Sequence, residues 1–198
     1  MFISPQLERL VKSLAHFPGI GRKTATRLAW HIISGDKAFA LELAENISKA
    51  AEVFQSCIKC NMLSESETCF ICAMLERSNA SICVVEHSSD VEILENMGEY
   101  DGRYFVLGHL LSPIDGYGPE EINSHKLLAR IQELEPEEII LALKPSAEGE
   151  ATMHFLWELL KDSGKKITRL SIGLPFGGDL EYSSSSTLRN AWQRRYGI

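Results

Sequence analysis

The sequence predicts an α+β protein of several modules: an N-terminal helical lobe, a four-cysteine module, an α/β domain with a mainly parallel sheet, and a C-terminal helical tail. Three observations predict this organisation. Apolar residues recur at helical spacing up to about residue 55, two Cys-x-x-Cys pairs follow, and short apolar runs then alternate with helical segments. The predicted modules span residues 1–56, 57–72, 80–175 and 176–198.

Charge is distributed unevenly along the chain. The 198 residues have a net charge of -7. Residues 1–35 contain five Lys or Arg and one Glu, so they carry +4 and the other 163 residues carry -11. A basic lobe on an acidic body predicts phosphate contact at one end and protein contacts elsewhere. It argues against a protein that coats nucleic acid with its whole surface.

Membrane insertion and export are not expected. No apolar run reaches the roughly 20 residues that a membrane-spanning helix needs. The first residues show no basic segment followed by an apolar core and a cleavage site. Together with cysteines spaced for a metal, this predicts a protein of the reducing cytoplasm.

Three helices are predicted in the N-terminal lobe. A capping serine and a proline open the first, at about 5–15, and a Pro-Gly break ends it. The second covers about 22–34. The third, about 37–55, is capped by Asp36 and is expected to serve as core and as a spacer to the cysteines. Its apolar face consists of Phe39, Leu43, Ile47 and Ala50.

The break between the first two helices is a candidate anion site. Gly19 and Gly21 lack side chains just before a helix N-terminus, where backbone N–H groups and the helix dipole favour negative charge. Arg22, Lys23 and Arg27 add basic side chains around it. We therefore predict a phosphate contact, which would not depend on base sequence. The alternative is a tight turn between two packed helices.

Residues 14–28 resemble the helix-hairpin-helix motif. They read Leu-Ala-His-Phe-Pro-Gly-Ile-Gly-Arg-Lys-Thr-Ala-Thr-Arg-Leu, which contains the Pro-Gly-Ile-Gly of that family and an alanine four positions further on, Ala25. The resemblance implies sequence-independent DNA binding through the hairpin.

Two Cys-x-x-Cys pairs predict a structural zinc site. The pairs are Cys57 with Cys60 and Cys69 with Cys72, separated by a polar loop of eight residues. Each pair can curl in a tight turn, so four thiolates can surround one ion and leave no position for a catalytic water. Two disulfides or two reduced pairs are the alternative. The fifth cysteine, Cys83, lies in an apolar run and is expected to be buried in a strand.

Strands and helices alternate after the cysteines. This alternation predicts an α/β layer with a largely parallel sheet, whose ligand edge lies beyond the carboxyl ends of the strands. The predicted strands are 81–86, 103–107, 138–143 and 166–172. The predicted helices are a short one through 90–96, then about 119–134 and 148–162, and a last one ending near 195.

Four acidic residues are expected at that edge of the sheet: Glu86, Asp90, Glu148 and Glu150. Clustered carboxylates of this kind hold Mg²⁺ in phosphoryl-transfer sites. The alternatives are contact with the basic surface of a partner, a single weakly held Mg²⁺, or acidic residues that only begin a helix.

Two segments resemble the Toprim domain of topoisomerases and primases. One contains Glu86 and Asp90, and the other is residues 144–151, Lys-Pro-Ser-Ala-Glu-Gly-Glu-Ala. The family pattern there is Asp-x-Asp-x-Glu-Gly-Glu, so Lys144 and Ser146 replace both aspartates. An ammonium in place of a carboxylate repels a cation by about 4 kcal/mol per unit charge at ~4 Å and an effective dielectric near 20. Two-metal catalysis is therefore not expected.

The order of these motifs is similar to the RecR family of bacterial recombination proteins over the whole chain, including Gly-Leu-Pro-Phe-Gly-Gly-Asp-Leu-Glu-Tyr at 173–182. The resemblance implies a non-catalytic DNA-repair factor that forms a ring-shaped tetramer and acts with RecO and RecF to load RecA onto gapped DNA. It implies that Lys23 and Arg27 face DNA and that the acidic edge meets RecO. The alternatives are a Mg²⁺-dependent nuclease, primase or topoisomerase, and a zinc-stabilised adaptor that never touches DNA.

Overall fold

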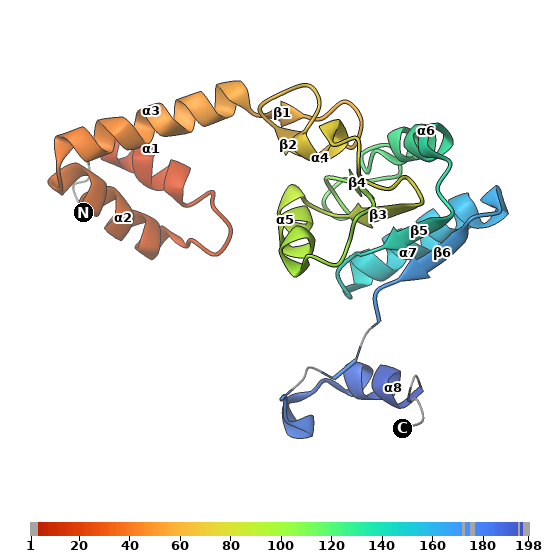
Figure 1. The fold of residues 1–198 in the computed structure, drawn as a ribbon. Coiled ribbons are helices and arrows are strands. Elements are labelled where there is room, and N and C mark those ends of the chain that lie inside the picture. The colour runs from red at the N-terminus through yellow and green to blue at the C-terminus, as the bar shows by residue number, and fades with distance from the viewer. Residues whose placement is uncertain (1–3, 172, 175–176, 194, 196–198) are drawn as a thin grey trace. The chain divides into compact units, whose positions relative to one another are not determined.

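The computed structural model describes residues 4–171, 173–174, 177–193 and 195 (Figure 1). The chain divides into two compact units, Met1–Phe54 and Gln55–Ile198. The predicted boundary at 175–176 lies outside the described residues. Within the described part of the chain, no helix combines the length and the apolar character needed to cross a membrane.

The first unit is a helical lobe. It consists of α1 (Pro5–Leu14), α2 (Arg22–Ser34) and α3 (Lys37–Val53), close to the predicted ranges. Ser4 caps α1 by accepting a hydrogen bond from the backbone N–H of Leu7 (3.2 Å), and Asp36 caps α3 in the same way. The small core between α1 and α2 is made of Leu7, Val11, Ala25 and Ala29.

The expectation that α3 belongs to the core is wrong. None of its 17 residues is buried, and Phe39 and Ile47 of its predicted apolar face are 51% and 60% exposed. The helical spacing correctly predicted a helix with an apolar face. However, periodicity alone does not say whether the same chain covers that face.

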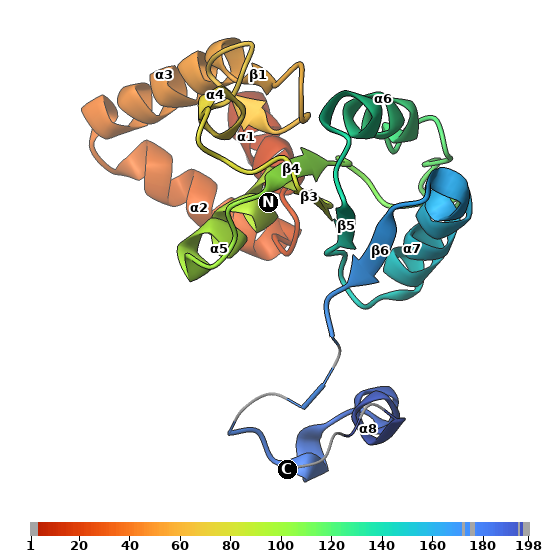
Figure 2. The same cartoon turned by 45° about the vertical axis from the view of Figure 1, so that its right-hand side comes forward.

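The second unit contains a four-stranded parallel sheet. Its strands lie in the order β4-β3-β5-β6, and every neighbouring pair is parallel, as predicted (Figure 2). The strands are β3 (Ser81–Val85), β4 (Arg103–Val106), β5 (Glu138–Leu141) and β6 (Lys166–Arg169). The helices are α5 (Ser88–Met97), α6 (Ser124–Leu134), α7 (Ala147–Leu160) and, near the C-terminus, α8 (Ser185–Gln193).

Two short 3₁₀ helices follow α7 and precede α8, at Lys161–Ser163 and Leu180–Tyr182. The helix predicted from Pro119 begins only at Ser124. The preceding Asn123 has a left-handed backbone (φ 53°), which a continuous right-handed helix excludes. The proline therefore starts a turn region and not the helix.

Helices α6 and α7 cover one face of the sheet. Alternate strand residues such as Val84, Phe105 and Leu141 point to this face and pack against Leu127 and Leu156. These side chains form the larger apolar core. A second layer covers the opposite face of β3 and β4, so these two strands are buried on both faces.

The second layer consists of α5 and the cysteine module. The module contains a two-stranded hairpin, β1 (Gln55–Ser56) and β2 (Leu63–Ser64), and one helical turn, α4 (Phe70–Ala73). It forms one apolar cluster with the second face of the sheet. The cluster contains Cys57, Cys60, Met62, Cys69, Ile71, Cys72, Cys83, Val85, Val91, Tyr104 and Val106. The cysteine module is thus part of the core of the second unit.

The cysteine module also covers the open edge of β4. The backbone N–H of Val106 donates to the carbonyl of Cys60 (2.8 Å), and the Asn61 side-chain amide donates to the carbonyl of Val106 (2.8 Å). Asn61 adopts a left-handed conformation (φ 63°), which asparagine tolerates better than most residues. These bonds satisfy backbone groups that an edge strand would otherwise leave open.

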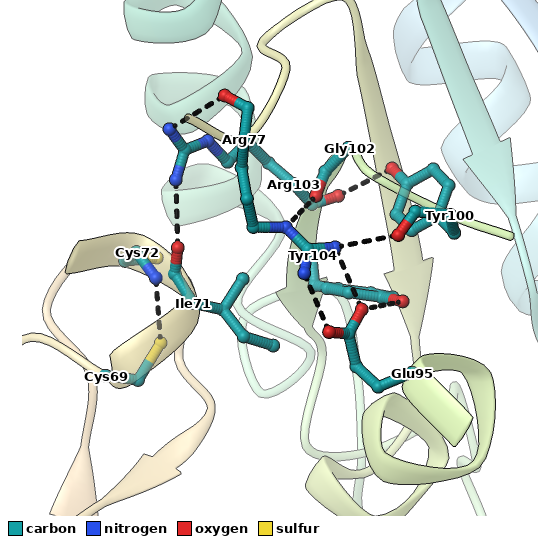
Figure 3. Close-up of polar contacts among 9 residues, drawn as sticks. All are labelled: Cys69, Ile71, Cys72, Arg77, Glu95, Tyr100, Gly102, Arg103 and Tyr104. Carbon is teal, nitrogen blue, oxygen red and sulfur yellow. Dashed lines mark hydrogen bonds and ion pairs between the residues drawn. The ribbon is translucent and has the colours of Figure 1, made fainter. Parts of the chain in front are cut away.

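Two arginines fasten the segment between the cysteines and β3 (Figure 3). Arg77 makes a bidentate ion pair with Glu95 of α5 (2.7 and 2.8 Å) and donates to the Gly102 carbonyl. The hydrogen bond from Arg77 lowers the pKa of Glu95. Arg103 of β4 donates to the carbonyl of Ile71 in α4 (2.9 Å). The cysteine module and the sheet are therefore linked by polar contacts as well as by apolar packing.

Candidate functional site

The turn before α2 leaves the helix N-terminus open. The N–H of Ile20 donates to the Phe17 carbonyl (3.1 Å), and Gly19 takes a left-handed conformation (φ 77°) that explains its glycine. Gly21, at the N-cap, has an ordinary extended backbone and provides no side-chain cap. A Cβ added at Gly21 would meet nothing within 4 Å. Packing within the lobe therefore does not require a glycine at this position. The close approach of a group from outside the lobe would require one.

The three basic side chains near the start of α2 differ in how far their charge is neutralised by other residues. Arg22 is ion-paired with Glu8 of α1 (2.9 Å), so part of its charge is neutralised within the lobe. Lys23 and Arg27 are exposed, and neither has an ion-pair partner among the residues that the structure describes. They are four residues apart on one helix and so share a face. The hairpin therefore presents two unneutralised cations beside the positive end of α2.

The four predicted cysteine ligands come together. Their Sγ atoms all lie within 4.8 Å of one another, all four residues are buried, and none forms a disulfide. Tetrahedral zinc with Zn–S bonds of ~2.3 Å places sulfur atoms about 3.8 Å apart. The Cys60 and Cys69 sulfurs are 3.5 Å apart. The geometry fits one ion with four sulfur ligands.

Backbone donors face these sulfurs, as expected for thiolates. The N–H of Cys69 donates to Cys57 Sγ (3.3 Å), and the N–H of Cys72 donates to Cys69 Sγ (3.4 Å). Side-chain hydrogen bonds, first from Cys60 and then from Cys72, lower the pKa of Cys69 to about 2. The hydrogen bond to Cys69 is the main cause that raises the pKa of Cys60. Four thiols this close cannot all ionise unless a cation joins them, so metal binding would release protons.

Cys83 lies outside this cluster. It is buried in β3, and burial raises its pKa to about 12. The prediction of a buried strand cysteine is confirmed.

The acidic edge is largely satisfied by the protein itself. Glu86, directly after β3, is only 8% exposed, and its Oε1 lies 3.2 Å from Lys144 Nζ and 3.2 Å from His87 Nε2. The ammonium of Lys144 thus occupies the position beside Glu86 where a metal cation would be needed. Among the described residues, the four cysteines are the only group of three or more potential metal ligands drawn close together.

The other acidic residues begin helices. Asp90 accepts a hydrogen bond from the backbone N–H of His87 (2.8 Å) and caps α5. Glu148 and Glu150 lie in the first turn of α7, and the backbone N–H of Glu148 is the main cause that lowers its pKa. Glu150 also makes two short bonds to the guanidinium of Arg169 (2.6 and 3.0 Å).

Both residues that replace the Toprim aspartates have structural roles. Lys144 pairs with Glu86, as described above, and Ser146 caps α7 by accepting a hydrogen bond from the N–H of Gly149 (3.1 Å). Gly149 is required by space, because a Cβ there would overlap the Lys144 carbonyl oxygen. The Glu-Gly-Glu segment thus begins α7, and the two residues before it that differ from the Toprim pattern serve as an ion-pair partner and a helix cap.

A surface cavity of about 440 Å³ opens at this edge. Its lining combines apolar side chains with the Glu86–Lys144 ion pair and Asp90, and includes Ile93, Leu94 and Leu170. Ile93 is 68% exposed. The cavity can receive a group that is largely apolar.

Sequence reasoning missed Arg169 as the ion-pair partner of Glu150, and it missed two buried arginines near the cysteines, Arg103 of β4 and Arg130 of α6. His87 and Arg169 carry no motif. Arg130 could have been found, since it lies with Leu127 and Ile131 on the buried face of α6, where a charged residue is unusual.

Comparison with known proteins agrees with these features. Residues 7–51 match the family described as "RecR, helix-hairpin-helix", and residues 80–171 match the Toprim domain family. A "Recombination protein RecR" from Halorhodospira halophila is 43% identical over 192 residues, which cover 97% of this chain and 96% of that protein. Proteins of the same name from Saccharophagus degradans and Myxococcus xanthus are 43% and 44% identical, over 98% and 96% of this chain and 99% and 96% of their own lengths.

These relatives are named as recombination proteins and not as nucleases, primases or topoisomerases, in agreement with the ammonium at the sheet edge. The sequence identity exceeds 40% along almost the whole of both chains, so each module of this chain has a counterpart in these relatives. The chain belongs to the RecR family of recombination proteins.

Proposed function

We propose that the protein is a non-catalytic factor of recombinational DNA repair that binds DNA without regard to sequence through its basic hairpin. The observation that carries this proposal is the pair of exposed, unneutralised cations, Lys23 and Arg27, beside an N-cap glycine that internal packing does not require. Backbone amides, a helix dipole and basic side chains together suit a phosphate. We propose Gly19, Gly21 and Arg22 as further contacts, with Arg22 weakened by Glu8.

The Toprim edge supports a non-catalytic role. Glu86 is held by Lys144 at 3.2 Å, and Glu150 is held by Arg169, so two of the four predicted acids already have cationic partners. Two-metal phosphoryl transfer needs free carboxylates that share cations. We propose instead that this edge serves for docking.

We propose that the four cysteines hold a structural Zn²⁺. Four sulfur ligands suit zinc, and a closed ligand set leaves no position for substrate. The ion would supply only cross-linking of the module. In a reducing cytoplasm, which we propose as the location, metal binding and not disulfide formation is the expected use of such cysteines.

We further propose that the protein assembles as a ring-like homotetramer that encircles DNA. The helical unit exposes several large apolar side chains that its own core does not use. They are Trp30, Ile33, Phe39, Leu41 and Ile47. In the C-terminal segment, Leu180 and Trp192 are likewise exposed. Apolar patches at the two ends of a chain suit a closed assembly, since large exposed patches usually mark interfaces.

A ring predicts topological retention on DNA. Protein bound to nicked circular DNA is expected to survive a wash in about 0.5 M salt at least tenfold better than protein bound to the same DNA after linearisation, because only a free end lets a ring slide off. Salt of this strength screens the direct phosphate contacts. Gel filtration of the washed complexes measures the difference. Equal loss from both forms would contradict the ring.

The cellular role that we propose is to act with RecO and RecF in helping to load RecA onto gapped DNA, with RecO docking at the acidic edge. Its support is the cavity of about 440 Å³, whose lining is largely apolar, together with the exposed Glu148 at the same edge of the sheet, which would suit a partly apolar, basic segment. Family membership supplies the identity of the partner.

Reversing one charge at this edge tests the docking. Glu148→Lys is expected to weaken RecO binding roughly tenfold, measured by titration calorimetry, because charges across an interface set recognition. Glu158→Lys is the control, since it changes the same exposed residue type further along α7. Equal RecO affinity of both variants would refute docking here.

A further inference from the structure

Arg130 is a buried cation beside the cysteine centre. The residue is 5% exposed, and it lies on α6, the helix that packs on the opposite face of the sheet from the cysteines. Its Nη2 is 3.9 Å from the Sγ of Cys72. Its Nη1 pairs with Glu133 (2.6 Å), whose own side chain is 55% exposed. Its Nε is buried without a hydrogen-bond partner among the described residues.

A second buried guanidinium binds the backbone of α4, next to Cys72 in sequence. Arg103 is 7% exposed and donates to three neutral oxygens, Asn79 Oδ1 (2.9 Å) and the carbonyls of Ile71 (2.9 Å) and Arg77 (3.1 Å). Within the described residues it has no carboxylate at ion-pair distance. Figure 3 shows it reaching the Ile71 carbonyl, between Cys69 and Cys72.

A bound metal would bring negative charge close to these buried cations. Two buried guanidinium groups carry +2, and their one carboxylate partner is half exposed. Four thiolates around a divalent ion carry a formal -2. Buried cations need nearby negative charge, and a metal ion with four thiolates supplies more of it than the cysteines without the metal. A metal thiolate centre would supply the missing charge at the position of Cys72.

From this we infer that Arg130 is a positioning residue of the metal centre: its guanidinium donates to the Cys72 thiolate from outside the ligand set and retains the metal, while Arg103 binds the backbone of α4 next to Cys72 in sequence. The inference rests on the proposed metal centre. Groups that bond to metal ligands typically change metal affinity by about 10- to 100-fold. Because Arg130 belongs to α6, metal retention is also linked to the packing of the sheet.

The test uses the full-length chain loaded with Co²⁺ or with Zn²⁺. In Arg130→Met, the sulfur-to-cobalt charge-transfer band is expected to move to longer wavelength, because a thiolate without its cationic neighbour gives up an electron more easily. The ligand-field bands of tetrahedral Co²⁺ are expected to stay in place. Zinc release to a chromogenic chelator is expected to be roughly tenfold faster.

Two controls separate this role from a general effect on folding. Lys126→Met removes the same charge from an exposed position on α6 and is expected to leave band and release rate unchanged. Glu133→Gln removes the ion pair of Arg130 but not its contact with sulfur, and is also expected to leave both unchanged. If Glu133→Gln reproduced Arg130→Met, the ion pair would be the cause and the inference would be overturned.

Arg130→Lys keeps the test decisive if Arg130→Met does not fold. Lysine keeps the positive charge but lacks the planar guanidinium group. We therefore expect a smaller band shift, and a rate of zinc release between that of the wild type and the tenfold faster rate. A wild-type band and release rate in the folded variant would overturn the inference. Failure to bind one Co²⁺ with a four-thiolate spectrum in the wild type would instead refute the metal centre itself.

Discussion

Lys23→Glu combined with Arg27→Glu is expected to reduce DNA affinity at least ~100-fold while leaving the mass of the oligomer unchanged. Each protomer would lose two phosphate contacts and gain two repulsive charges at the open N-terminus of α2. In the proposed ring several protomers would act on one DNA, so the loss would multiply across the assembly. Fluorescence anisotropy with a labelled duplex measures affinity, and light scattering measures mass.

A matched control keeps the same charge change within the same unit. Lys37→Glu with Lys49→Glu reverses two exposed lysines on α3 and leaves the hairpin intact. We expect this variant to lose no more than a few-fold in affinity, through the general field of the lobe. An equal loss in both double variants would show that net charge and not the hairpin determines binding. Monomers in the first variant would contradict separate sites for DNA and assembly.

Loss of the metal is expected to unfold the second unit while the helical lobe keeps its structure. In Cys60→Ser, the ligand set is incomplete at the center of the cluster that covers one face of the sheet. Structural zinc sites contribute on the order of 10 kcal/mol to folding. This equals the entire stability of a typical domain, about 5–15 kcal/mol. The cooperative unfolding transition of the α/β unit should therefore disappear.

Circular dichroism during heating, with metal content measured on the same samples, tests this expectation. Cys83→Ala is the control, because it removes a buried cysteine of the same apolar cluster that is not a candidate ligand. We expect this variant to bind one metal ion per chain and to unfold cooperatively, with a free energy of unfolding lower by about 1–2 kcal/mol. Should Cys60→Ser melt like the control, the centre would not be structural.

Much of the fold could be predicted because local chemistry determines it. The Ser-Pro start of α1, the Pro-Gly break and the alternation of buried strands with helices gave the right elements in the right order. The four cysteines were identified as one cluster, because paired spacing near a turn brings thiols together in few other ways. The acidic residues were placed at the correct edge, because parallel strands end together.

The predictions that failed concern residues whose contacts lie far away in the sequence. The apolar face of α3 is real, but no residue of the helical unit buries it, and periodicity cannot report this. The acids at the edge were predicted as a group, yet Lys144 pairs with Glu86 and Arg169 pairs with Glu150. Arg130 meets Cys72 across 58 residues of chain. Contacts of this kind follow from tertiary packing and not from spacing.

The dependence of DNA affinity on salt tests the central claim most directly, namely that the hairpin grips DNA and the Toprim edge does not. The slope of log affinity against log salt should fall by roughly 1.8 per engaged lobe in Lys23→Glu with Arg27→Glu, since each phosphate contact contributes about 0.9. Glu86→Gln should leave the slope unchanged. A slope unaltered by the hairpin variant, or altered by Glu86→Gln, would contradict the account.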